Sequence, residues 1–487
     1  MSMKKFNIYI YAVIIGCTMG TSCTKDFQEK NANPNAINDV TPDLLMPTII
    51  RSVCNEVVNQ SWGIGNIVIQ HTAKIQFVSE DRYTWGDRSG LFNNMYGNMR
   101  DVERLIALGD AKNVPNYKAA GLVLRAWMYS LLTDAYGDVP YSEAMSGVSG
   151  ILMPKYDSQE SIYDGILKDL ETANTTFNSS AGTLVGDILY NGNLTQWRKL
   201  ANSLQLRYLM RISGKKNVAA DMQAIINGAN TPVFESNDDN GALTYLTVSP
   251  NQFPLHTTRS GSFDEFRLSK TLGDKLLALG DTRIAVFAQK ADATGTYTGV
   301  PNGLNEVDAL AYNGGPNNIS RVGSYFFLDA ITETGLKVAR GYIMGYPELQ
   351  FILAEAVQKG MINTGNTAQW HYEEGIKASF SYFESTMPAG YLTQANVAFN
   401  DTDALTLIGT QKWISLFFTG LEAWFDWRRT NIPALVAGAD NVNNDRIPVR
   451  FAYPRSEQTL NSGNRNAAVG AQGWSEDTYN EKVWWDQ

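Results

Sequence analysis

Residues 117–136 read YKAAGLVLRAWMYSLLTDAY, and Gly137-Asp138-Val139-Pro140 follows directly. Apolar or small side chains recur there every three or four residues, at Ala120, Leu124, Met128, Leu131 and Ala135. This spacing lays one apolar stripe along an α-helix, and a Gly with a nearby Pro ends such a helix. The stretch therefore predicts a helix that buries one face against other helices.

The same spacing returns further along the chain, which extends the prediction to the whole fold. The other expected helices are 158–173, 196–213, 347–360, 372–383 and 411–424. Several of them can be paired with Ala and Gly at the contact positions, as in tetratricopeptide packing, although no strict repeat of about 34 residues is present. The predicted fold class is all-α (mostly), with tetratricopeptide-like helical pairs at about 117–213 and 347–425.

Two segments, about 76–95 and 225–341, lack this periodicity. The longer one is rich in Gly, Asn, Thr and Pro, and contains only short β-like pieces such as 242–248. Long loops in a compact protein are usually functional or disordered. We expect both segments to be loop-rich, ligand-facing insertions in a single domain that covers 42–487.

The first residues resemble an export signal. Lys4 and Lys5 precede an apolar run over 6–16, and small residues with Cys17 and Cys23 follow. This order is typical of a secretory signal peptide, and the run is shorter than the about 20 residues that span a bilayer. A lipoprotein signal ends at a Cys that becomes acylated. The residues alone leave three interpretations open: lipidation of Cys17, lipidation of Cys23, or a plain cleaved signal peptide.

Composition excludes several classes of protein. The chain has 487 residues, of which 44% are hydrophobic and 18% charged, so a wholly disordered or collagen-like chain is excluded. Its net charge of −9 argues against a broad nucleic-acid surface, and no nucleic-acid partner is expected. Eleven Trp, 23 Tyr and 20 Phe against three His favour packing and stacking over acid–base chemistry.

No motif predicts a metal, cofactor or catalytic site. His71, His256 and His371 are scattered without ligand-type spacing. The segment 236–241 resembles half of a calcium loop, but Thr247 stands where the bidentate acid belongs, so an acidic turn is favoured. A structural calcium ion stays an unsupported alternative. A secreted glycoside hydrolase is a second alternative, because the spacing of its two carboxylates is spatial and invisible in sequence.

Aromatic residues in the loops are the candidate binding groups. A flat ring in a polar loop can stack on the apolar face of a sugar, while Asn and Asp side chains bind its hydroxyls. The candidate ligand-binding residues are Asp81, Tyr83, Trp85, Asn93, Tyr297, Asn302 and Tyr312. The alternative is that these side chains tether their loops to the helical scaffold.

Short blocks along the chain carry a family resemblance. They are Cys23-Thr24-Lys25-Asp26-Phe27, Asn33-Pro34-Asn35, LLTDAYGDVPY at 131–141, WRKLANSL at 197–204, FILAEA at 351–356, EAWFDWRRT at 422–430 and KVWWD at 482–486. In this order they resemble SusD/RagB-family outer-membrane lipoproteins, in the SusD-like subgroup. The resemblance covers nearly the whole mature chain.

The resemblance implies a fold, a place and a role. The fold would be a tetratricopeptide-like scaffold with loop-rich insertions. Residues 1–22 would be a lipoprotein signal peptide and 23–41 a tether acylated at Cys23, although Gly20 departs from the expected apolar residue. The protein would be anchored in outer-membrane lipid and face the cell exterior.

The role that the resemblance implies is capture without catalysis. The protein would bind an oligosaccharide, or alternatively a peptide, and deliver it as the lid of a SusC-like TonB-dependent outer-membrane transporter. It would be no enzyme and need no cofactor. The block Asp426-Trp427-Arg428-Arg429 is interpreted as a structural clamp, with guanidinium groups stacked on Trp and paired with Asp.

Overall fold

The structure is a computed structural model that describes residues 40–257, 260–327 and 330–487. The signal peptide, Cys17 and Cys23, and most of the tether lie outside the described residues. Residues Pro42–Gln487 form one compact unit. Within the described ranges, no helix combines the length and the apolar character needed to cross a membrane.

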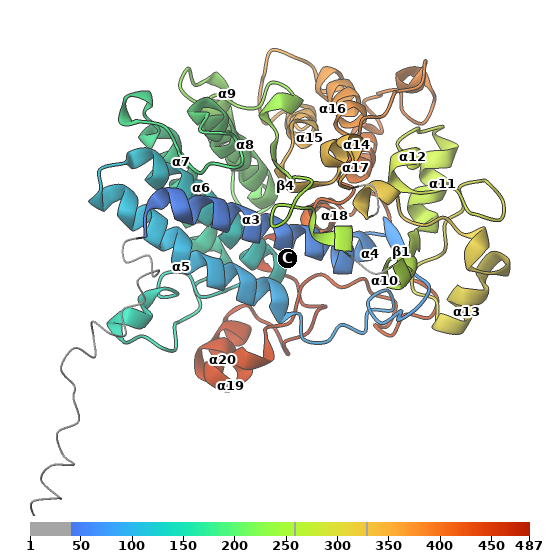
Figure 1. The fold of residues 1–487 in the computed structure, drawn as a ribbon, viewed down its shortest axis with the longest axis horizontal. Helices are drawn as coiled ribbons and strands as arrows, with labels where there is room; N and C mark the ends of the chain where they lie inside the picture. The colour runs from blue at the N-terminus through green and yellow to red at the C-terminus, as the bar shows by residue number, and fades with distance from the viewer. Residues whose placement is uncertain (1–39, 258–259, 328–329) are drawn as a thin grey trace, which may run out of the picture. The chain divides into compact units, whose positions relative to one another are not determined.

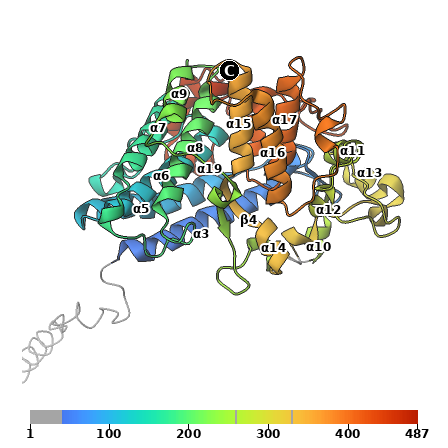
Figure 2. The ribbon, with the colours of Figure 1, turned by 90° about the horizontal axis from the view of Figure 1, so that it is seen from above.

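One group of helices contains the segment that opened the sequence. α5 (Ser89–Ala111), α6 (Pro115–Tyr136), α7 (Gln159–Thr176) and α8 (Leu194–Ile212) lie side by side, and α3 (Pro42–Gln60) packs on α5 (Figures 1 and 2). α6 begins with Pro at its first position, where the missing N–H costs nothing, and ends at Gly137 with φ +89°.

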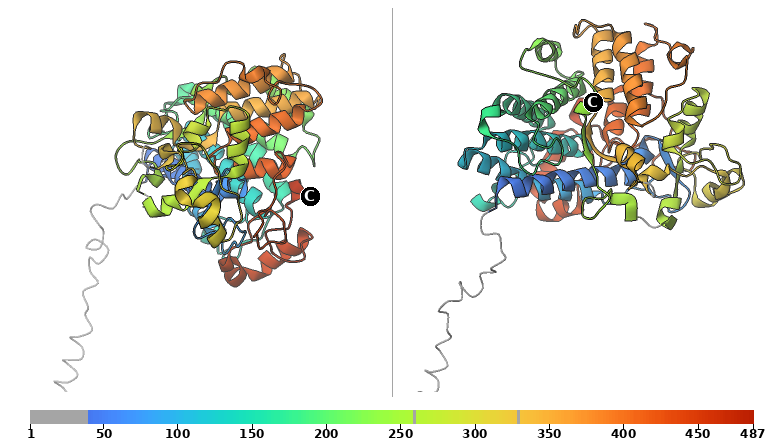
Figure 3. Two further views of the ribbon diagram at one scale, coloured as in Figure 1. Left: turned by 90° about the vertical axis from the view of Figure 1, so that its right-hand side faces the viewer. Right: turned by 45° about the horizontal axis from the view of Figure 1, so that its top comes forward.

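A second group continues the layer. α15 (Tyr346–Gln358), α16 (Ala368–Tyr382) and α17 (Ala404–Ser415) lie alongside one another next to α8 (Figure 2). The right-hand view of Figure 3 also shows the teal and green helices of the first group next to the orange helices of the second. The prediction of a mostly α-helical scaffold is therefore confirmed, with helix ends within about four residues of those expected, except for 411–424.

The prediction of one helix over 411–424 is wrong. α17 ends at Ser415, and a separate helix, α18 (Glu422–Thr430), follows a sharp turn. Gly420 in that turn has φ +74°, and a Cβ there would come within 2.8 Å of Val57. The apolar spacing continued through the break because both flanking helices and the turn are buried, so periodicity alone could not reveal it.

Two small antiparallel sheets join segments far apart in sequence. β1 (Thr72–Lys74) pairs with β3 (Phe266–Leu268), so that Ala73 lies opposite Arg267. β2 (Gly241–Thr244) pairs with β4 (Arg340–Met344). The β-like piece expected at 242–248 thus forms a strand only as far as Thr244.

Short helices fill the rest of the unit. Their bounds are α4 (Asn66–Val68), α9 (Ala219–Asn227), α10 (Ser260–Asp264), α11 (Lys270–Ala278), α12 (Ile284–Phe287), α13 (Glu306–Ala311), α14 (Glu333–Val338), α19 (Arg455–Leu460) and α20 (Ser462–Ala471). The segment 225–341 is therefore loop-rich but contains several single-turn helices.

The loop-rich part has an apolar cluster of its own. Its buried members are Ala73, Ile75, Val78, Val300, Ala309 and Ile319. These residues come from β1, the loop after it, and the region around α13. The small cluster holds together loops that are distant in sequence, and Leu304 packs against it.

Candidate functional site

Trp85 is an internal packing residue. Its side chain is 3% exposed, and its ring meets Trp424 edge-on at a centroid distance of 5.8 Å. Phe451 lies 5.5 Å from the same ring, and the indole N–H donates to the Glu80 carbonyl over 3.0 Å. The expectation that Trp85 presents its face to a ligand is corrected: the faces are covered by the scaffold, as in the tethering alternative.

Asp81 and Asn302 form a buried node. The Asn302 amide donates to the Asp81 carboxylate over 2.7 Å and to the Thr72 carbonyl over 2.8 Å. The Lys74 N–H donates to the other Asp81 oxygen over 2.9 Å, and the Ser269 hydroxyl donates to Asn302 over 2.6 Å. Burial raises the pKa of Asp81 to about 7 despite these donors. Both side chains tie loops together, as in the tethering alternative, and both are buried.

Tyr83 is also buried. It is 2% exposed and has φ +63°, a left-handed conformation that is uncommon for an aromatic residue. Burial raises the pKa of its phenol above the ordinary value. Three of the candidate residues therefore sit on one inward-turning loop between β1 and α5.

The other three candidates lie nearer the surface. Asn93 is exposed, but it lies in the second turn of α5, so the loop predicted at 76–95 ends earlier than expected. Tyr297 is half-buried, with the Lys290 ammonium 5.9 Å from its ring centroid. Tyr312 is half-buried against the small apolar cluster. None of these three residues, and not Trp85, lines any of the cavities described below.

Phe77 is an exposed ring that the sequence did not single out. Its side chain is 66% exposed, and its φ of +49° turns the chain sharply. The Phe77 N–H donates to the Glu306 carboxylate over 2.8 Å, which fixes the loop against α13. Ile75 and Val78 on either side are buried, so Phe77 projects from a loop that is otherwise packed against the protein. A strained, exposed aromatic residue on a well-held loop is a candidate binding group.

A cavity of about 350 Å³, here called the loop cavity, lies beside the buried node. Its lining residues are Gln70, Lys270, Thr271, Asp274, Pro301, Asn302, Leu304, Ala434, Val436, Gly438 and Ala439. Among the candidates predicted from sequence, only Asn302 lines it. The volume falls in the range of small-molecule binding pockets.

The polar groups of the loop cavity are held in place. The Gln70 amide donates to the Val436 carbonyl over 2.6 Å and accepts from the Thr271 hydroxyl over 2.6 Å. The ammonium of Lys270 pairs with Asp274. The cavity thus offers amide and hydroxyl groups, an ion pair without net charge, and apolar surface from Leu304 and Val436. This mixture suits a neutral, polyhydroxylated ligand.

One wall depends on a close backbone contact. A Cβ on Gly438 would lie 1.9 Å from the carbonyl oxygen of Asn302, and Gly303 opposite has φ +70°. Asp440 extends the join, because its N–H donates to the Gly303 carbonyl over 3.0 Å and its carboxylate accepts from the Asn305 N–H over 2.8 Å. Only glycine allows the segments 301–305 and 434–440 to approach this closely.

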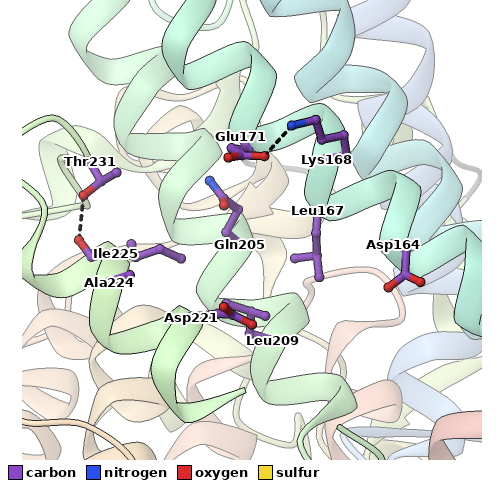
Figure 4. Close-up of a pocket in the computed structure, with 10 residues that line it drawn as sticks. All are labelled: Asp164, Leu167, Lys168, Glu171, Gln205, Leu209, Asp221, Ala224, Ile225 and Thr231. Atoms are coloured by element: carbon purple, nitrogen blue, oxygen red, sulfur yellow. Dashed lines mark hydrogen bonds and ion pairs between the residues drawn. The ribbon is translucent and has the colours of Figure 1, made fainter. Parts of the chain in front are cut away.

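Another cavity, of about 440 Å³, lies between α7, α8 and α9 (Figure 4). Leu167, Leu209 and Ile225 give it apolar surface, and Lys168 pairs with Glu171 over 2.8 Å. None of its lining residues was predicted as a ligand group, whereas the predicted residue Asn302 lines the loop cavity. We therefore take the loop cavity as the candidate site.

The Asp239 carboxylate of the segment 236–241 is engaged within the protein. In the described part of the chain, no group of three or more His, Cys, Asp or Glu side chains could hold an ion. At the acidic turn, Asp239 accepts from the Glu235 N–H over 2.8 Å and from the Lys199 ammonium over 2.9 Å.

The chain resembles known proteins over most of its length. The SusD-like_2 family model, described as "Starch-binding associating with outer membrane", matches residues 34–454. No match was found among curated proteins.

Solved structures give the same likeness. A SusD homologue from Bacteroides fragilis is 29% identical, with a TM-score of 0.79, and the match covers 92% of this chain and 100% of that one. A chitin-binding protein is 27% identical, with a TM-score of 0.76 and the same coverage. A chitin-binding SusD homologue from Flavobacterium johnsoniae is 24% identical, with a TM-score of 0.79 over 92% of this chain and 98% of that one, which shows likeness of fold alone.

Proposed function

The chain belongs to the SusD-like family, and from that premise we propose that it is a cell-surface lipoprotein that captures an oligosaccharide. It would hand this cargo, as a lid, to a SusC-like TonB-dependent transporter in the outer membrane. The observation that carries the proposal is the loop cavity, whose amide, hydroxyl and apolar groups match a sugar. A peptide cargo is the alternative.

A neutral glycan is the favoured cargo. The single cation and the single anion that line the loop cavity, Lys270 and Asp274, are paired with each other. A charged ligand would have to break this pair, whereas hydroxyl groups can bind beside it. The family description names starch, and a 27% identical relative is named for chitin binding. Neutral glucans and chitin oligosaccharides are therefore the first ligands to test.

The role would be binding without cleavage. A glycoside hydrolase needs two carboxyl groups about 5–10 Å apart around the scissile bond. Among the described residues that line the loop cavity, Asp274 supplies the only carboxylate, and Lys270 engages it. Incubation with starch and chitin oligosaccharides should therefore release no reducing ends. Release that disappears in Asp274→Asn would favour the hydrolase instead.

Titration calorimetry of protein that starts at Lys25 tests the binding proposal. We expect heat of binding with at least one neutral oligosaccharide series. Phe77 does not line the loop cavity, but it is held at Glu306, two residues after the lining residue Leu304. We propose that its exposed ring contacts ligand that extends out of the cavity, so Phe77→Ala should weaken that binding about tenfold, since loss of an aromatic contact costs more than about 1 kcal/mol. Trp370→Ala is the matched control, since Trp370 is another exposed ring, 44% accessible, on α16. Absence of binding to every oligosaccharide would contradict the proposal.

Anchoring and partnership need separate tests. Mass spectrometry of the native protein should find acyl chains on Cys23, and Cys23→Ala should release the protein from the membrane. Affinity capture from solubilised outer membrane should bring down a large β-barrel transporter. An unacylated product, or capture without a transporter, would contradict these two parts of the proposal respectively.

A further inference from the structure

A second polar cavity, here called the α11–α17 cavity, lies at the C-terminal end of α11. Its volume is about 310 Å³. Its lining residues are Lys275, Ala278, Leu279, Tyr372, Ala395, Asn396, Asn400, Asp403, Thr406, Leu407, Thr410 and Gln411. They come from α11, α16, the connection that leads to α17, and α17 itself. No candidate residue predicted from the sequence lies in it.

The floor of this cavity is rigid. Gln411 is 1% exposed, accepts from the Arg283 guanidinium over 3.0 Å and donates to the Tyr391 hydroxyl over 3.1 Å. The Tyr372 hydroxyl donates to the Val397 carbonyl over 2.8 Å, which fixes the connection above it. Fixed polar groups with apolar neighbours provide a preorganised surface for a ligand.

The rim carries exposed neutral polar groups. Asn396 lies in the connection between α16 and α17, Thr406 lies in the first turn of α17, and both are exposed. Lys275 and Asp403 contribute one charge of each sign, so the cavity has no net charge, like the loop cavity. The chain carries a net charge of −9, which disfavours an acidic ligand.

One face of α11 connects the two cavities. Lys270, Thr271 and Asp274 line the loop cavity, while Lys275 and Ala278 line the α11–α17 cavity. At 3.6 residues per turn these five positions fall within an arc of about 140°. The buried residues Leu272 and Leu276 lie on the opposite side of the helix.

The two cavities adjoin near the middle of α11, at the successive residues Asp274 and Lys275, and together they extend along its length. The helix has nine residues, so it extends for about 13 Å. A disaccharide is too short to occupy both ends at once, whereas a longer chain can lie along the exposed face.

We infer that a single neutral oligosaccharide spans both cavities along α11, with Asn396 and Thr406 as hydrogen-bonding residues of a second subsite. The inference rests on the proposed function and makes it more specific. The cargo is an extended, uncharged chain, and the second subsite raises the affinity for longer chains. Ligands that fill both cavities gain contacts without a second loss of translational freedom.

Calorimetry with a maltooligosaccharide series and a chitooligosaccharide series, from disaccharide to octasaccharide, tests this inference. In the unmodified protein the affinity for the recognised series should rise with length and then level off. The double variant Asn396→Ala/Thr406→Ala should bind the octasaccharide about tenfold more weakly, equivalent to about 1.4 kcal/mol, and bind the disaccharide unchanged. Thr402→Ala, an exposed change in the same connection but outside the cavity, is the matched control.

The outcomes separate the two proposals. If short and long oligosaccharides bind equally well, and the double variant matches the control, the second subsite is wrong while the proposed function stands. If no oligosaccharide binds, both are wrong. Ala278→Tyr, which fills the cavity from the exposed face of α11, gives an independent check: it too should remove the gain with length and spare disaccharide binding.

Discussion

At the residue scale, buried ion pairs around α18 form a clamp, whose members are Glu355, Lys412, Asp426 and Arg429. Arg429 makes a bidentate contact with Glu355, 2.6 Å to each oxygen, and also donates to Asp426 over 2.9 Å. Lys412 donates to the same Asp426 carboxylate over 2.8 Å. Arg428 lies 4.8 Å from the ring centroid of Trp424. The interpretation of this block as a clamp agrees with these contacts, which join α15, α17 and α18.

Removal of one clamp member should destabilise the fold. Arg429→Met leaves the buried carboxylates Glu355 and Asp426 with one lysine each, Lys359 and Lys412, and removes the bidentate contact, which should lower the free energy of unfolding by about 3 kcal/mol. Urea denaturation measures this change. Arg100→Met, at an exposed arginine, should alter the stability by less than about 0.5 kcal/mol. Equal stability of the two variants would contradict a clamp.

The clamp also predicts a dependence on pH. Burial alone would raise the pKa of Glu355, but Arg429 and Lys359 lower it to about 2, from an ordinary value of 4.5. A lowered pKa in the folded state gives stability that is present above pH 4.5 and is lost as the pH falls toward 2. The loss is on the order of 3 kcal/mol.

Thermal unfolding between pH 7 and pH 2 measures this loss. Glu355→Gln removes the titrating group, so its midpoint should fall less steeply than that of the unmodified protein below pH 4.5. Parallel curves across that range would mean that Glu355 titrates alike in the folded and unfolded states.

At the element scale, the sequence predicted the long helices well and the loops poorly. The apolar stripe of α6 depends on local spacing alone, so its C-terminal end was predicted at the right residue. Trp85 could not be placed in this way, because its partners Trp424 and Phe451 lie more than three hundred residues away. Asp81 and Asn302 are residue types that can bind sugars, but here they bond to each other across 221 residues of sequence, which local patterns cannot reveal.

The loop cavity itself depends on how two segments meet. Gly438→Ala should push the segment 434–440 away from Asn302, since the new Cβ would lie 1.9 Å from a carbonyl oxygen. We expect oligosaccharide binding to weaken at least tenfold and the unfolding midpoint to fall, because a backbone segment must shift, while helical content changes little. Calorimetry and circular dichroism measure these. Gly463→Ala on α20, where a Cβ meets nothing within 4 Å, is the control and should bind normally.

At the scale of the whole compact unit, the long helices form the scaffold and the loop-rich part carries the candidate site. The two helix groups form a continuous layer, and the loop-rich part lies beside it with α11, α12 and α13 (Figure 1). The helices and much of the loop-rich part share one large core, which includes Phe266, Leu272 and Phe287. The small cluster around Val300 and the Asp81–Asn302 node add further contacts between loops. Loops held by a rigid scaffold are a common way to present a binding site.

Hydrogen–deuterium exchange with and without a binding oligosaccharide tests the central claim most directly. The account predicts slower exchange in the segments 70–77, 301–305 and 434–440 around the loop cavity, and on the α16–α17 connection when the ligand is long. Exchange in α7, α8 and α9 should not change. Protection confined to those three helices, with the loop segments unaffected, would contradict the account.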